Sequence, residues 1–174
     1  MVLHTVTIKG QGYSYAMNSP DRFHGVSGFD VVTGKTPAAA PSFSSVFGEA
    51  VCELAEEYER ICTITAAMKS GTCLQDFAAR FPERFFDVGI SEGHAVAMAA
   101  GMAKQGCVPV FAVYSSFLQR GYDMLIHDVA LLGLHVVFGV DRAGLVGEDG
   151  ETHHGLFDVA YLSTVPGMNL YAPS

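Results

Sequence analysis

A chain of 174 residues is long enough to form one compact domain around a single hydrophobic core. Its 49% hydrophobic and 16% charged residues exclude a disordered tail and a membrane-embedded bundle. A formal charge of -8 and the lack of a Lys/Arg run argue against nucleic-acid binding, although a local basic pocket for a small phosphate is compatible with this charge.

The sequence pattern predicts little regular secondary structure in the first 41 residues. Residues 3–8 alternate apolar and polar side chains, which predicts a strand that ends at a turn containing Gly10 and Gly12. Residues 14–41 are rich in Gly and Pro without periodicity and are typical of a long linker. We therefore interpret residues 1–41 as the last strand of an upstream domain plus an irregular linker, and residues 42–174 as an α/β domain.

From Ser42 onward, helical and strand patterns alternate along the chain. We expect helices over residues 42–58, 72–81, 92–104, 117–132 and 157–162, and strands over residues 61–65, 85–89, 108–113, 135–140 and 169–172. Near-continuous apolar strands that alternate with helices favour a doubly wound, mostly parallel sheet with helices on both faces. In such sheets ligands bind beyond the carboxyl ends of the strands.

The four cysteines form no CxxC pair, and each lies in an apolar stretch, as expected of free thiols in a reducing compartment. No signal peptide is apparent, and no segment approaches the roughly 20 apolar residues that cross a bilayer. We therefore expect a cytoplasmic protein without membrane or nucleic-acid partners.

The loops that follow the expected strands carry most of the chemically useful side chains. Glu92 opens a helix that is otherwise rich in Ala, Val and Met. It is either a buried acid that faces a ligand nitrogen or a first-turn carboxylate that complements the helix dipole. His153 and His154, with Asp149 nearby, suit a metal site or acid/base chemistry, but a solvated polar loop is the alternative because no third ligand has a recognised spacing.

Four segments together resemble a known family: ICTITAAM, RFPERFFDVGISEGHAVAMAAGMA, FAVYSSFLQRGYDMLIHDVALL and GVDRAGLVGEDGETHHGLFDVAYL. They are similar to the central, pyrimidine-binding domain of the 1-deoxy-D-xylulose 5-phosphate synthases, which are transketolase-like thiamin diphosphate enzymes. The earlier strings KGQGY and RFHGVSGFD resemble the end of the first domain and the linker of that family. The EDGxTH loop also occurs in transketolases, whereas YSSFLQRGYD and DRAG look like the synthases.

The resemblance implies a set of cofactor contacts. Glu92 matches the glutamate that hydrogen-bonds N1' of the aminopyrimidine and so activates the thiazolium C2 position. Phe117 matches the aromatic residue that packs on the pyrimidine, and Ile90 matches an apolar neighbour, although both also suit ordinary core positions. Lys9 matches a lysine near the diphosphate and otherwise reads as a solvated residue before a turn.

The implied reaction condenses pyruvate with D-glyceraldehyde 3-phosphate, releases carbon dioxide and serves isoprenoid-precursor and thiamin biosynthesis. The matching substrate-binding residues are Tyr13, Tyr114, Arg120, Arg142, Asp149 and His153. By the same match, Asp149, His153 and His24 join Glu92 as catalytic candidates. A guanidinium donates two hydrogen bonds to a phosphate at once, which suits Arg120 and Arg142. A helix-surface ion pair is the alternative for Arg120, and a loop histidine without a role is the alternative for His24.

The chain departs from the family at one position and lacks two of its parts. Gly93 stands where the family commonly has glutamine, which also weakens the case for His94. The diphosphate and magnesium ligands belong to the first domain of the family, and a further phosphate-binding arginine belongs to the third. We therefore expect no metal site here, no turnover by this chain alone, and a homodimer only with those domains. A transketolase, a subunit of a split transketolase-like enzyme and a non-catalytic association domain are the alternatives.

Overall fold

The computed structural model describes residues 1–37, 40–147 and 149–173. Contacts divide the chain into two compact units, Met1–Pro41 and Ser42–Ser174. In the first unit, one short helix, α1 (Ser14–Asn18), lies beside a cluster of aromatic rings. Tyr13 packs against Phe23 and Phe29 in that cluster, with ring centroids 5.6 and 5.8 Å apart. These rings give the unit its small apolar centre.

The strand predicted over residues 3–8 is wrong. These residues are exposed and take part in no ladder among the residues that the structure describes. An isolated strand leaves its backbone donors and acceptors without partners, so alternation of side chains alone does not produce one. The strand predicted over residues 169–172 is absent for the same reason, and Tyr171 within it is 88% exposed.

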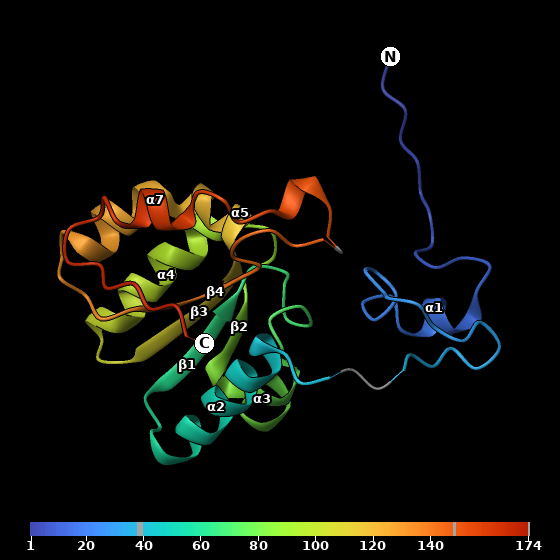
Figure 1. The fold of residues 1–174 in the computed structure, drawn as a ribbon, viewed down its shortest axis with the longest axis horizontal. Coiled ribbons are helices and arrows are strands. Elements are labelled where there is room, and N and C mark those ends of the chain that lie inside the picture. The colour runs from blue at the N-terminus through green and yellow to red at the C-terminus, as the bar shows by residue number, and fades with distance from the viewer. Residues whose placement is uncertain (38–39, 148, 174) are drawn as a thin grey trace. The chain divides into compact units, whose positions relative to one another are not determined.

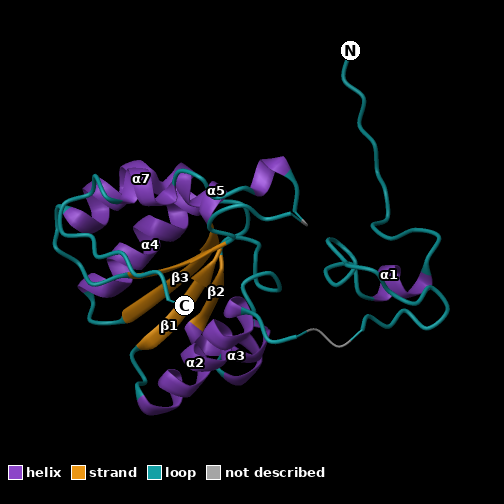
Figure 2. Ribbon diagram, viewed as in Figure 1, coloured by secondary structure: helices purple, strands orange, loops and turns teal. Residues whose placement is uncertain are grey.

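The second unit is built on a four-stranded sheet with the order β2-β1-β3-β4 (Figure 2). Its strands are β1 (Ile61–Thr65), β2 (Phe85–Asp87), β3 (Val108–Tyr114) and β4 (Val137–Asp141), and all three pairings are parallel. β1 and β3 are almost fully buried because helices cover both faces. The expected doubly wound parallel sheet is thus confirmed. Its strand order reverses between β1 and β3, which is where such sheets bind ligands.

Helices lie on both sides of the sheet (Figure 1), and a hydrophobic cluster packs each group of helices against it. One cluster packs the Ala-rich helix α4 (Glu92–Lys104) and the segment after β3 against one face, with Phe111 and Leu125 completely buried. The other packs α2 (Phe43–Glu57) and α3 (Gln75–Arg80) against the opposite face around Phe77. A capping box between Ser42 and Ser45 fixes the start of α2.

The helix predicted over residues 117–132 is divided into four pieces. They are α5 (Ser115–Leu118), a 3-10 turn η2 (Gln119–Gly121), α6 (Tyr122–Met124) and a π-helical segment η3 (Leu125–Ala130). The break coincides with a close approach to α4: a Cβ atom at Gly121 would lie 2.8 Å from Val96 Cγ2. Packing against α4 therefore overrides the regular helical repeat at this point.

The remaining elements are short. The 3-10 turn η1 (Pro82–Arg84) precedes β2, and η4 (Glu151–His153) and α7 (Asp158–Leu162) follow β4. α3 begins later than the predicted helix over 72–81, because Cys73 has a φ of 56° that a right-handed helix does not accept. No helix within the described ranges is both long and apolar enough to cross a membrane.

Candidate functional site

The parallel strands bring four loops to one edge of the sheet, where Thr65, Asp87, Tyr114 and Asp141 end their strands. The loops after β1 and β3 meet closely at the reversal of strand order. A Cβ atom at Gly71 would lie 1.6 Å from the hydroxyl oxygen of Tyr114, so only glycine leaves room for that ring. This contact places the end of β3 against the loop that follows β1.

Glu92 is the first residue of α4 and lies at this edge. Its side chain is 3% exposed, and Oε1 accepts a hydrogen bond of 2.9 Å from Nη1 of Arg120 in η2. Arg120 is itself 57% exposed. A carboxylate that merely complements a helix dipole has no need of burial, so the burial of Glu92 favours the interpretation as an acid that faces a ligand. The ion pair occupies Oε1 only.

Two aromatic rings form the wall beside Glu92. Tyr114 and Phe117 stack with centroids 5.8 Å apart and an angle of 23° between the planes. The guanidinium of Arg142 lies 4.4 Å from the Tyr114 ring, and that of Arg120 lies 5.1 Å from the Phe117 ring. The His153 ring meets both aromatic rings edge-on, at 6.2 and 5.1 Å. Five predicted site residues besides Glu92 are therefore linked to one another through these rings.

Arg142 is held by three oxygen atoms. Its Nη1 donates to Asp141 Oδ2 and to the carbonyl of Gly71, and its Nε donates to Asp149 Oδ2, each at 2.9 Å. Burial alone would lower the pKa of Arg142, but the hydrogen bond to Asp149 and the charge of Asp141 raise it above its ordinary value. Burial also raises the pKa of Tyr114, which keeps its phenol protonated. Arg142 is therefore a fixed cation at the mouth of the site.

The backbone at Arg142 is strained. Its φ of 55° lies in the left-handed region, which costs a non-glycine residue about 1 to 2 kcal/mol. An isolated β-bridge joins Gly144 to Gly155 just after Arg142. A Cβ atom at Gly155 would lie 2.4 Å from the Arg142 carbonyl. The surrounding loop thus holds Arg142 in a conformation that aims its side chain back over Tyr114.

The two histidines of the last loop have different surroundings. His154 Nδ1 accepts a hydrogen bond of 2.9 Å from the backbone N–H of Val146, whereas His153 faces the aromatic wall. Within residues 1–37, 40–147 and 149–173, no three His, Cys, Asp or Glu side chains gather as a metal site. His154 therefore braces the loop, and His153 is the histidine directed at the site.

Sequence reasoning missed two contributors to this network. Asp141 pairs with Arg142 and also accepts a hydrogen bond of 2.8 Å from Ser44 Oγ at the start of α2. Gly71 supplies both the space for Tyr114 and a carbonyl for Arg142. Asp141 could have been found from its position at the end of a strand, but nothing near Gly71 in the sequence signals its contact with residues far along the chain.

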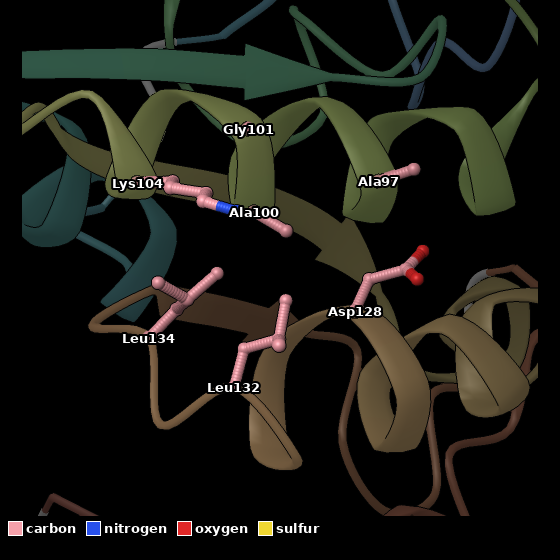
Figure 3. Close-up of a pocket in the computed structure, with 7 residues that line it drawn as sticks. All are labelled: Ala97, Ala100, Gly101, Lys104, Asp128, Leu132 and Leu134. Carbon is pink, nitrogen blue, oxygen red and sulfur yellow. The ribbon is translucent and has the colours of Figure 1, made fainter.

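A separate groove of about 310 Å³ lies between α4 and the stretch formed by η3 and the segment that follows it (Figure 3). Ala97, Ala100 and Gly101 form its α4 side, with Lys104 and Asp128 as its charged members. None of the predicted site residues is among the described residues that line it. The groove is therefore separate from the residues that the sequence analysis selected.

Comparison with known proteins shows the family of the chain. Residues 39–174 match the family model described as the transketolase pyrimidine-binding domain. The chain belongs to this family. It is 59% identical over 172 residues to the 1-deoxy-D-xylulose-5-phosphate synthase of Symbiobacterium thermophilum, and 56% identical to synthase 1 of Geobacter sulfurreducens. Those alignments cover 99% of this chain but only 26% and 28% of the two relatives.

Solved structures show the same fold. A split-gene transketolase, described as an inactive beta4 tetramer, is 30% identical and matches 69% of this chain and 39% of its own with a TM-score of 0.59. The transketolase of Leishmania mexicana, at 20% identity, matches 76% of this chain and 21% of its own with a TM-score of 0.65. The parallel sheet is therefore that of the pyrimidine-binding domain.

Four further predicted residues of this pyrimidine-binding chain lie outside the contact network just described. Ile90 is 80% exposed in the turn before α4. Lys9 and His24 are exposed within the Met1–Pro41 unit. In the same unit, the Tyr13 hydroxyl donates to the Val31 carbonyl at 3.0 Å. Their predicted roles stay predictions.

Gly93, which departs from the family pattern, lies close to the side chain of Met124. A Cβ atom at Gly93 would lie 2.9 Å from Met124 Cε, at the flexible end of that side chain. His94, the next residue, is exposed in α4. Met124 thus takes part of the space that a side chain at position 93 would use.

Proposed function

We propose that this chain forms the aminopyrimidine side of a thiamin diphosphate site in a 1-deoxy-D-xylulose 5-phosphate synthase. The observation that carries the proposal is the buried carboxylate of Glu92 beside the stacked rings of Tyr114 and Phe117. A carboxylate in a site of low dielectric forms a strong hydrogen bond with a ring nitrogen. The two 59% and 56% identical relatives carry the name of that synthase, which supports the same choice.

These residues fit the aminopyrimidine on chemical grounds. Because Arg120 occupies Oε1 of Glu92, the second oxygen is available to accept a hydrogen bond from protonated N1'. The wall formed by Tyr114 and Phe117 offers an aromatic surface of the kind on which a planar heterocycle packs. When bound, thiamin diphosphate supplies the electron sink that decarboxylation of a 2-oxo acid requires. Glu92 holds the proton at N1' while that chemistry proceeds.

Arg120 serves Glu92 as a positioning residue in this proposal. Its guanidinium fixes one carboxylate oxygen and lies over Phe117, so the acid and the aromatic wall are aligned together. Arg120 is more than half exposed, which leaves other N–H groups for a substrate anion. Its assigned part in substrate binding is therefore compatible with the ion pair.

The acceptor site is proposed around Arg142, Asp149 and His153. The bonds from Arg142 to its two carboxylates and to Gly71 leave its second terminal amine outside those contacts. That amine is the group we assign to the phosphate of D-glyceraldehyde 3-phosphate. We assign to His153, which meets the same aromatic wall, the exchange of a proton with the aldehyde oxygen.

The complete enzyme needs more than these residues. We propose that Lys9 and Ile90 bind the cofactor, that Tyr13 binds substrate and that His24 is catalytic, as the family resemblance implies. We also propose a cytoplasmic homodimer in which the first domain of the family, outside these 174 residues, supplies the ligands of the diphosphate and magnesium. On that basis the 174-residue chain alone does not turn over pyruvate. The inactive tetramer of the split-gene transketolase is a precedent for a partial chain of this fold.

The experiment compares Glu92→Gln with Glu56→Gln in the active enzyme, because Glu56 is an exposed carboxylate that pairs with Arg80. Carbon dioxide release from pyruvate in the presence of D-glyceraldehyde 3-phosphate is expected to fall by about 100-fold or more in Glu92→Gln only. An equal effect of both variants contradicts the proposal. Transfer of ketol units between sugar phosphates, without carbon dioxide release, would favour the transketolase alternative.

A further inference from the structure

The carboxylate of Asp141 joins the first turn of α2 to the guanidinium of Arg142. Asp141 is the last residue of β4, and its Oδ1 accepts a hydrogen bond of 2.7 Å from the backbone N–H of Arg142. Its Oδ2 accepts two further hydrogen bonds, at 2.9 Å from Nη1 of Arg142 and at 2.8 Å from Oγ of Ser44. Asp141 therefore binds both the backbone and the side chain of one arginine.

These bonds bear on the strained backbone of Arg142. A residue other than glycine keeps a φ of 55° only where its surroundings hold it there. Hydrogen bonds to an ionised carboxylate are stronger than those between neutral groups, so the two bonds to Asp141 offset part of the strain. Loss of this carboxylate would release the backbone and the guanidinium of Arg142 together.

Ser44 in turn holds the carboxylate. It is the second residue of α2, a helix whose start is fixed by a capping box and whose inner face packs on the sheet. The side chain of Asp141 is 21% exposed, against 34% for Asp149, the other carboxylate that binds Arg142. The less exposed of the two contacts is thus the one that is anchored to a helix.

We propose that Asp141 and Ser44 are positioning residues for the phosphate of the acceptor substrate, and that they act through Arg142. This inference rests on the proposed function, in which Arg142 binds that phosphate. A guanidinium donates two hydrogen bonds to a phosphate only when its planar fork faces the phosphate oxygens. Asp141 and Ser44 fix that orientation and do not contact the substrate themselves.

The charge of Asp141 separates this role from a simple electrostatic one. A carboxylate near a phosphate repels it, so an electrostatic role alone predicts tighter binding of the phosphate in Asp141→Asn. A positioning role predicts the reverse. In Asp141→Asn one carboxylate oxygen becomes an amide NH2 group, which accepts no hydrogen bond from Arg142 or Ser44.

The test compares steady-state kinetics of the active enzyme with D-glyceraldehyde 3-phosphate and with unphosphorylated D-glyceraldehyde. Asp141→Asn is expected to raise KM for the phosphorylated acceptor by about tenfold or more, the factor that one hydrogen bond to a charged group contributes. The value of kcat and the KM for the unphosphorylated acceptor should stay as in the unmodified enzyme. Ser44→Ala should raise the same KM selectively, whereas Ser44→Thr, which keeps the hydroxyl, should not.

Ser45→Ala is the matched control. Ser45 lies beside Ser44 in the same helical turn, and its hydroxyl bonds the backbone of Ser42 instead of Asp141. This variant loosens the start of α2 and is expected to leave both KM values unchanged. A selective rise of KM in Ser45→Ala as large as that in Ser44→Ala overturns the inference. Ser44→Ala retains the carboxylate and the guanidinium, so it tests the inference even if Asp141→Asn does not fold.

Arg142→Met distinguishes failure of this inference from failure of the proposed function. If KM for the phosphorylated acceptor is unchanged in Arg142→Met, the assignment of Arg142 to the phosphate is wrong and the inference falls with it. If that KM rises in Arg142→Met but is unchanged or lowered in Asp141→Asn, or is unchanged in Ser44→Ala, only the positioning role is overturned.

Discussion

Removal of the Arg120 guanidinium tests how strongly the structure holds Glu92. In Arg120→Met the stem of the side chain is kept, but the 2.9 Å hydrogen bond to a 3% exposed carboxylate is lost. A hydrogen bond to a charged group contributes about 1.5 to 3 kcal/mol, and breaking a fully buried ion pair costs about 3 to 5 kcal/mol. Arg120 is 57% exposed, so solvent screens the pair and we expect a loss of about 2 kcal/mol.

The assay is a double-mutant cycle of Arg120→Met and Glu92→Gln, followed by urea unfolding of the chain. The matched control is the cycle of Arg80→Met and Glu56→Gln, whose side chains are 43% and 60% exposed. Exposed pairs contribute about 0.2 to 1 kcal/mol, so the control coupling is expected to be clearly smaller. If the coupling of Arg120 with Glu92 is no larger than that of the control pair, the claim that burial strengthens this contact is refuted.

Three further changes probe other parts of the structure. Gly71→Ala should displace the Tyr114 ring and destabilise the chain by about 1 to 3 kcal/mol. Gly101→Ala in α4, where a Cβ atom meets nothing within 4 Å, should stabilise the chain by about 0.5 to 1 kcal/mol. Equal urea midpoints of the two variants would contradict both expectations. Gly93→Gln should cost about 1 to 2 kcal/mol, because the flexible Met124 end must move, and an unfolded variant would show that this space is rigid. The pKa of Cys62 is raised to about 11, so between pH 9 and 11 the unfolded state binds fewer protons than the folded state and the free energy of unfolding falls as pH rises. This fall should amount to about 1 to 3 kcal/mol and should be smaller in Cys62→Ala; identical slopes in the two proteins would contradict the shift.

Side-chain periodicity was enough to predict the elements that pack along their whole length. The amphipathic pattern after Ser42 yields α2, and the apolar runs around Ile64 and Phe111 yield the two central strands. Periodicity failed where neighbours decide the conformation. Residues 3–8 alternate correctly but have no strand beside them, and the regular pattern after Phe117 is broken where Gly121 meets α4.

The candidate site was predictable in its residues but not in its contacts. Motif resemblance pointed to Glu92, Arg120 and Arg142, and the structure brings these side chains to one edge of the sheet. It did not reveal that Arg120 pairs with Glu92, which lies 28 positions away on another element. Nor could any local pattern show that Gly71 receives Tyr114, because that contact depends on the parallel pairing of β1 and β3.

We propose that the Glu92 carboxylate promotes loss of the C2 proton of thiamin diphosphate. Hydrogen–deuterium exchange at C2 of the bound cofactor, followed by rapid quench and NMR, measures that step without either substrate. We expect exchange that is at least about 100-fold slower in Glu92→Gln than in the unmodified enzyme, with cofactor bound in both. Equal exchange rates in the two proteins would show that Glu92 does not act on the cofactor.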